Sequence, residues 1–90
     1  MKLTEQEISL FNTACEWWSA NNPPYGEPAD VRKHLMFAQK QLKPDCEDGI
    51  EPGSMSAVDR VLSDYAEAFP ELSDSVKLLL SHITELFFDL

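Results

Sequence analysis

The segment Asn21–Pro28, NNPPYGEP, divides the first half of the chain into two helices. Proline interrupts a helix, glycine permits turn geometries that other residues avoid, and Pro28 suits the first turn of a following helix because its missing N–H costs nothing there. We therefore predict a corner between two helices. Tyr25 lies within this corner, and we expect its ring to pack against Trp17 or Trp18 rather than to bind a partner.

The other prolines and glycines lie in the segment 44–53 and at position 70, so four segments remain between the breaks. Each carries apolar residues at spacings of three and four, which is the period of one helix face. We expect helices at 4–20, 28–43, 55–69 and 73–89, and no strand. The similar lengths predict an all-α fold, a small single domain that is four-helix bundle-like or orthogonal in its packing.

Local signals support these boundaries. Thr4 and Glu7 have the spacing of a capping box at the start of the first helix, and Ser56 and Asp59 have the same spacing near the start of the third. The residue before a proline disfavours helical geometry, so the third helix should end just before Pro70. Because so few residues separate the third and fourth helices, we expect these two to be neighbours.

The apolar faces predict the core. Its expected members are Leu3, Ile8, Leu10, Phe11, Ala14, Cys15, Trp17, Trp18, Val31, Leu35, Ala38, Leu42, Val58, Val61, Leu62, Tyr65, Phe69, Val76, Leu79, Leu80, Ile83, Leu86, Phe87 and Leu90. Leu78 and Phe88 lie off the stripe of the fourth helix, which indicates either a helix buried on several sides or a seam between two copies.

The net charge of −9 comes from the second half of the chain. Residues 1–43 carry five acids and five bases, whereas residues 44–90 carry eleven acids and two bases. Two interpretations are open: a solvated outer face, or a docking surface for a basic partner. The acids predicted to bind in the second case are Asp45, Glu47, Asp48, Glu51, Asp59, Asp64, Glu67, Glu71 and Asp74.

A second candidate surface lies on the second helix. Met36 and Phe37 fall far from its apolar stripe, among the basic residues Arg32, Lys33 and Lys40. Large apolar side chains in such a place are either covered by another segment or part of an interface. We include Met36 and Phe37 in the predicted protein-binding set, with cover by the first helix or by the segment 44–53 as the alternative.

No catalytic machinery is evident, and we expect neither enzymatic activity nor a cofactor. Cys15 lies on an apolar face, and the acids around Cys46 should raise the pKa of its thiol, so neither resembles an activated nucleophile. His34 and His82 stand singly at helix edges, where we expect them to be solvated or hydrogen-bonded. No zinc-ligand spacing and no glycine-rich phosphate loop are present.

Composition also bears on location and partners. No apolar stretch approaches the length of a membrane span, and the first residues become charged at once, unlike a signal peptide. The acidic balance opposes direct binding of nucleic acid. We therefore expect a cytoplasmic protein that contacts neither membrane nor nucleic acid.

These patterns favour a noncatalytic acidic protein-binding module. We expect an inhibitor of the immunity or anti-defence type, which docks on a basic partner such as a nucleic-acid-acting protein. The colicin immunity proteins are similar to this chain in size, charge and helical class, although none of their motifs is present. In this hypothesis the acids attract the partner and apolar side chains anchor it. The alternative is a small homo-oligomeric structural or regulatory protein, such as a homodimer, with the second or fourth helix as its seam.

Overall fold

The computed structural model describes residues 3–42 and 52–88, with the side chains of 3–42 and 53–85. These residues form four α-helices and one short 3₁₀ turn: α1 (Glu5–Ala20), α2 (Glu27–Gln41), α3 (Pro52–Ala68), η1 (Pro70–Leu72) and α4 (Ser73–Phe88). No strand occurs in this described part of the chain. The prediction of an all-α fold with four helices is confirmed.

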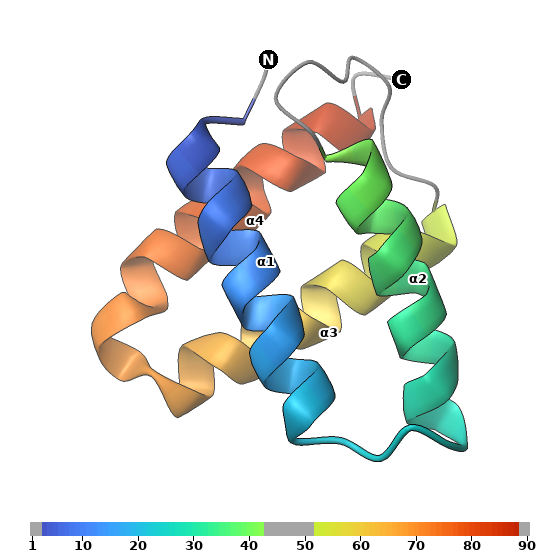
Figure 1. Ribbon diagram of the computed structural model, residues 1–90. Coiled ribbons are helices and arrows are strands. Elements are labelled where there is room, and N and C mark those ends of the chain that lie inside the picture. The colour runs from blue at the N-terminus through green and yellow to red at the C-terminus, as the bar shows by residue number, and fades with distance from the viewer. Residues whose placement is uncertain (1–2, 43–51, 89–90) are drawn as a thin grey trace.

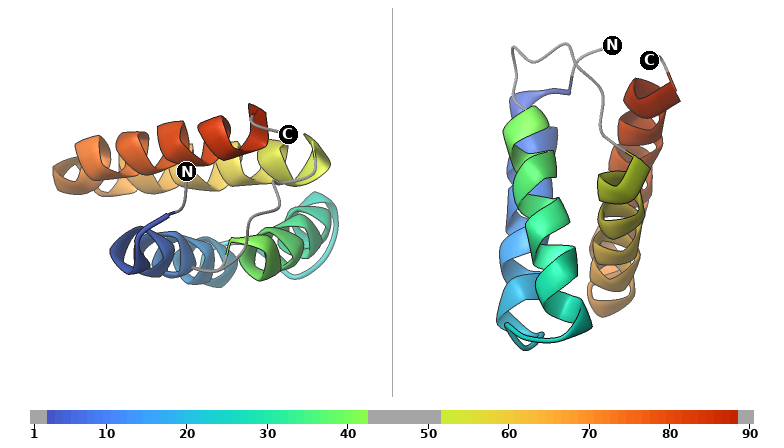
Figure 2. Two further views of the ribbon diagram at one scale, coloured as in Figure 1. Left: turned by 90° about the horizontal axis from the view of Figure 1, so that it is seen from above. Right: turned by 90° about the vertical axis from the view of Figure 1, so that its right-hand side faces the viewer.

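The helices form two layers, each an antiparallel pair. Figure 1 and Figure 2 show α1 beside α2 in one layer and α3 beside α4 in the other. Seen from above, α1 and α2 are viewed almost along their axes while α3 and α4 run lengthwise, so the layers cross steeply (Figure 2). The packing is therefore the orthogonal variant. Helix α3 contacts all three other helices, whereas α1 and α2 touch each other only slightly.

The capping box at the start of α1 forms as predicted. The Glu7 N–H donates to Thr4 Oγ1 at 3.1 Å, and the Thr4 N–H donates to Glu7 Oε1 at 3.0 Å. These two bonds satisfy amide groups that lack partners within the helix itself. The side chain of Glu7 is thereby held in place at the first turn.

The corner between α1 and α2 is also confirmed. The side-chain amides of Asn21 and Asn22 donate to the carbonyls of Trp17 and Trp18, each at 2.8 Å, and so satisfy acceptors in the last turn of α1. Gly26 precedes α2 with φ at 72°, a conformation that side-chain-bearing residues rarely adopt. The asparagines and the glycine therefore have distinct roles in ending one helix and starting the next.

Both boundaries of α3 and both boundaries of α2 differ from the prediction. Helix α3 begins at Pro52 instead of residue 55, because proline fits a first helical turn, and Ser56 lies inside the helix. The predicted capping box at Ser56 is therefore wrong. The same helix ends at Ala68, one residue early, because Phe69 takes φ −129° and ψ 76° before Pro70. Helix α2 begins one residue earlier and ends two residues earlier than expected.

The core contains the predicted apolar faces. Its buried residues are Leu3, Phe11, Ala14, Cys15, Trp18, Val31, Leu35, Ala38, Leu42, Ala57, Val58, Val61, Leu62, Tyr65, Val76, Leu79 and Ile83. Half-buried residues pack around it, including Ile8, Leu10, Trp17, Phe69 and Leu80. Leu86, Phe87, Phe88 and Leu90 lie outside the described side chains.

An aromatic cluster joins α1 to the end of α3. The ring centroid of Trp17 lies 5.4 Å from that of Tyr65 and 5.8 Å from that of Phe69, both in edge-to-face geometry. The ring centroids of Tyr65 and Phe69 are 4.8 Å apart. Tyr25, by contrast, is 72% exposed. The expected packing of Tyr25 on a tryptophan is wrong, because both tryptophans turn toward α3 and leave the corner outside the core.

Polar contacts tie α2 to α1 where apolar contact is slight. The guanidinium of Arg32 donates to the carbonyl of Ser19 and, at 2.5 Å, to that of Asn22. One turn from the other end, Gln39 donates to Asn12 at 3.0 Å. These bonds link α2 to α1 and to the corner that follows α1.

Candidate functional site

The nine acidic residues of the predicted binding set fall into three groups. Four lie outside the described residues: Asp45, Glu47, Asp48 and Glu51. Four are exposed on α3, η1 and the first turn of α4: Asp59, Glu67, Glu71 and Asp74. The ninth, Asp64, is half-buried.

Asp64 faces the opposite layer instead of the solvent. Its Oδ2 accepts a hydrogen bond at 3.0 Å from the indole Nε1–H of Trp18, a side chain that is only 1% exposed. A buried indole N–H requires an acceptor, and the carboxylate of Asp64 supplies one. The placement of Asp64 in a free acidic surface is therefore corrected: it joins α1 to α3.

Arg60 marks the edge at which the acidic surface stops. Its guanidinium lies 5.8 Å from the ring centroid of Trp18 and pairs with Glu27 of α2 at 2.7 Å. Both partners of this ion pair are exposed, so it contributes little stability. Its effect is local, because it places a cation on the side of α3 that faces the other layer.

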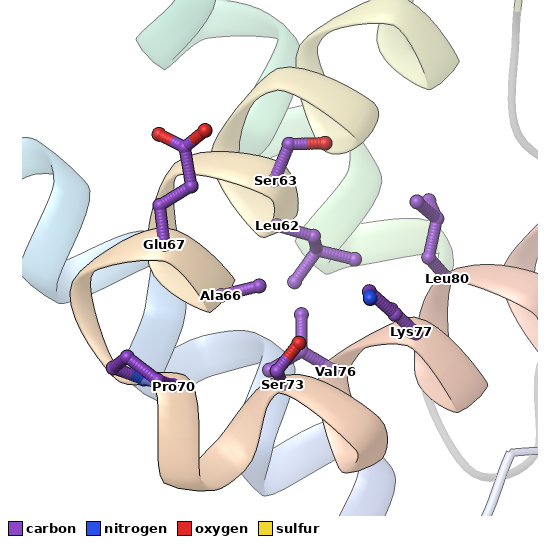
Figure 3. A pocket seen from close by; sticks show the side chains of 9 residues that line it. All are labelled: Leu62, Ser63, Ala66, Glu67, Pro70, Ser73, Val76, Lys77 and Leu80. Carbon is purple, nitrogen blue, oxygen red and sulfur yellow. The ribbon is translucent and has the colours of Figure 1, made fainter.

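A groove lies on the outer side of the α3–α4 layer, with α1 and α2 behind it (Figure 3). Its volume is about 560 Å³. Leu62, Ala66 and Val76 lie at its centre, Leu80 lies at one side, and Pro70 lies at one end (Figure 3). Polar and charged residues complete its wall: Ser63, Glu67, Ser73 and Lys77.

The exposed acids flank this groove. Asp59, Ser63 and Glu67 follow one another at intervals of four along α3, so they lie on one side of the helix. Glu71 adjoins Pro70, and Asp74 adjoins Ser73, both at the end where Pro70 lies. Lys77 is the one basic residue in the groove wall. An apolar centre with an acidic border is thus presented on a single face, which we call the acidic groove.

The acidic groove was not predicted from the sequence. Leu62 and Val76 are buried core residues, as predicted, and they lie beneath the groove, whereas Leu80 is only half-buried and lines it. A signal was present in the small residues Ser63, Ala66 and Ser73, because small side chains on adjacent helices leave space between them. The tight connection at Pro70 then determines that these residues of α3 and α4 lie opposite one another.

The second predicted surface lies on α2. Met36 and Phe37 are 59% and 56% exposed, so α1 and the other described residues leave more than half of each side chain uncovered. Of the segment 44–53, predicted as an alternative cover, residues 44–51 lie outside the described residues. Lys33 and Lys40 are also exposed, and Lys40 Nζ lies 6.0 Å from the ring centroid of Phe37. With Val31 and Leu35 inside, helical geometry places all four outward. We call Lys33, Met36, Phe37 and Lys40 the α2 face.

Cys15 lines a smaller groove between α1 and α2, of about 350 Å³. The thiol is buried, and burial, with a smaller contribution from the charge of Glu16, raises its pKa to about 12. The thiol is therefore protonated near neutral pH and lacks the thiolate that a nucleophilic cysteine requires. Cys46 lies outside the described residues.

The two histidines occupy helix edges, as predicted. His82 Nδ1 lies 2.5 Å from Glu7 Oε2, which links α4 to the first turn of α1. His34 is exposed beside Gly53, where an added Cβ would lie 3.2 Å from the imidazole.

Burial alone would raise the pKa of Glu7, but hydrogen bonds from the Thr4 amide and from His82, with the attraction of a protonated His82, lower it below its ordinary value.

Two further properties concern ligands and membranes. In residues 3–42 and 52–88, no three His, Cys, Asp or Glu side chains gather where they could hold a metal ion. None of the helices described is both long enough and apolar enough to span a membrane. Neither finding identifies what the protein binds.

Comparisons with known proteins add no assignment. No protein-family model, no curated protein and no solved structure matches the chain. The acidic groove and the α2 face are therefore the two features of the molecule from which a function is proposed.

Proposed function

We propose that this chain is a noncatalytic protein-binding module, an inhibitor of the immunity or anti-defence type, whose acidic groove docks on a basic partner protein. One observation carries the proposal: an apolar groove and exposed acids share the outer face of the α3–α4 layer. Apolar anchors supply most of the binding energy in protein interfaces, and complementary charge guides the approach and fixes the orientation.

The geometry favours a partner segment with an apolar side chain flanked by lysine or arginine. The apolar side chain would enter between Ala66 and Leu80, and the flanking cations would lie near Asp59 and Glu67. A helix is a suitable form for such a segment, because an amphipathic helix fits a groove between two helices. A basic segment of a nucleic-acid-acting protein has this chemistry.

In this proposal the anchoring role belongs to the groove and not to Met36 and Phe37. The α2 face and the acidic groove are on opposite layers of the molecule, whose smallest extent is 18 Å (Figure 2). A partner segment seated in the acidic groove therefore does not reach Met36 or Phe37. The attraction by acidic residues is retained from the sequence-based hypothesis, whereas the anchor moves from Met36 and Phe37 to the groove, on the same face as the exposed acids.

Binding to defined peptides tests the proposal. We would titrate the protein into a fluorescent helical peptide that carries leucines on one face and lysines beside them, and into a matched peptide with glutamate in place of lysine. We expect only the basic peptide to bind, with affinity falling at least about tenfold between about 50 and 300 mM salt.

Substitutions locate the site. Asp59→Lys/Glu67→Lys should lower the affinity for the basic peptide by about tenfold or more. Leu80→Lys should also lower this affinity, because it places a charge in the groove. The matched control, Glu5→Lys/Asp30→Lys, makes the same charge change on exposed residues of the other layer and should alter affinity less than about twofold. Salt-independent binding, or equal losses in control and groove variants, would reject the acidic groove.

A further inference from the structure

We propose that a second copy of this chain is an occupant of the acidic groove, and that it binds there through the α2 face. This inference depends on the proposed function, because it uses the same groove. It assigns a role to Met36 and Phe37, which are more than half exposed although large and apolar. It also supplies the chemistry that the groove favours, since the α2 face carries apolar side chains beside cations.

The complementarity is specific in both shape and charge. Met36 and Phe37 lie between Lys33 and Lys40 along one helix, and Lys40 Nζ lies 6.0 Å from the centroid of the Phe37 ring. The groove offers apolar side chains at its centre and acids at its border. Its volume of about 560 Å³ is within the range of pockets that enclose several apolar groups.

Like charge disfavours the simpler pairing of one α2 face with another. In a twofold dimer through α2, Lys33 and Lys40 of one copy would approach the same residues of the other copy. Pairing of two groove faces has the same defect, because acids would face acids. Only the unlike pairing, the α2 face on the acidic groove, brings opposite charges together.

The unlike pairing has a consequence for the size of the assembly. The two surfaces lie on opposite layers, so each copy that donates its α2 face still presents a free groove of its own (Figure 2). Such head-to-tail contacts generate rings or open chains. Self-association would therefore proceed past the dimer as concentration rises, and it would compete with a basic partner for the groove.

A charge-swap experiment tests the pairing. Sedimentation velocity over a concentration series would be run on the wild type, on Lys33→Glu/Lys40→Glu, on Asp59→Lys/Glu67→Lys, and on an equimolar mixture of the two variants. We expect concentration-dependent association of the wild type, at least about tenfold weaker association of each variant alone, and recovery in the mixture. Recovery occurs because the acidic α2 face of one variant meets the basic groove of the other.

Two controls make the result specific. Met36→Ser/Phe37→Ser should abolish association, whereas Tyr25→Ser removes a still more exposed aromatic side chain outside both surfaces and should leave it unchanged. Circular dichroism melts of every variant establish that loss of association is not loss of folding. A wild type that stays monomeric up to about 1 mM, or a mixture that fails to recover, would overturn the inference.

The peptide titration separates this inference from the proposed function. Lys33→Glu/Lys40→Glu retains the groove and should still bind the basic peptide. A monomeric wild type that binds the peptide would overturn self-pairing and leave the proposed function standing. A monomeric wild type that does not bind it would overturn both.

Discussion

Two pairs of adjacent large apolar residues have opposite environments in this molecule. Trp18 is 1% exposed and Trp17 is half-buried, whereas Met36 and Phe37 are both more than half exposed. Each pair lies in the middle or last part of an amphipathic helix, and neighbours on a helix point about 100° apart. A pair of this kind is covered only where its helix packs on more than one side.

The two helices differ in their neighbours. Helix α1 lies across α3 and also contacts α4 and α2, so Trp17 packs on Tyr65 and Phe69 while Trp18 reaches Asp64. Helix α2 packs mainly on α3, and Arg32 holds it to α1 through polar contacts. The exposure of the α2 face thus follows from the packing of α2 mainly on one neighbour, α3, which leaves the opposite side of the helix uncovered.

The sharpest test of the comparison is Trp18→Ala. Removal of a large, fully packed side chain leaves a cavity and also deprives Asp64 of its donor, so we expect a loss of about 3–5 kcal/mol in the free energy of unfolding. Urea denaturation measures the loss. If the variant is too unstable to study, Trp18→Phe should show a smaller loss in the same direction, and a cost below about 1 kcal/mol for Trp18→Ala would contradict the packing described.

Asp64 and Asp59 separate a structural acid from a surface acid. Asp64→Ala leaves the buried indole N–H of Trp18 without its acceptor and should cost about 1–3 kcal/mol. Asp59→Ala removes an exposed carboxylate on the same helix and should change stability by less than about 0.5 kcal/mol. Equal costs in urea denaturation would place Asp64 back among the surface acids.

The contact between Glu7 and His82 predicts a pH dependence. Because the pKa of Glu7 is lowered in the folded protein, the unfolded chain takes up a proton first as pH falls. The stabilisation is therefore fully present above the ordinary carboxyl pKa and is lost as pH falls through the lowered value. Glu7→Gln keeps a capping side chain but removes the charge, so its deficit relative to the wild type should be largest near about pH 6 and shrink below about pH 4.

Thermal or urea unfolding at several pH values measures this deficit. Glu5→Gln changes an exposed acid in the same turn and serves as the control. A deficit for Glu7→Gln that does not vary with pH would contradict the charged contact with His82.

The smallest expected effect belongs to the α2 face. Met36→Ser/Phe37→Ser removes two large apolar side chains that are already mostly in solvent, so we expect a change in unfolding free energy below about 1 kcal/mol. Phe11→Ser, at a fully buried position, should cost several times more. A large loss for the α2 pair would show that these residues serve folding and not binding.

The two candidate surfaces were predictable only in part. Met36 and Phe37 were recognisable because they lie off the apolar stripe of their helix, and the exposed acids were recognisable from the charge of the second half. Asp64 was not separable from the acids near it, since its role depends on Trp18, 46 positions away in the chain. The acidic groove could not be predicted for a related reason, because it lies between α3 and α4 and neither helix alone shows which residues of the other lie opposite.

The sequence by itself determined the helices and their breaks. Prolines, glycines, caps and apolar periodicity act within a few residues, so the four helices, the Asn21–Pro28 corner and most of the core could be read directly. The tertiary structure decided how the layers cross, which of two neighbouring acids is buried, and where apolar side chains remain uncovered. These properties depend on which helices become neighbours across the fold, and adjacent positions in a sequence do not encode the distance between faces that meet only after folding.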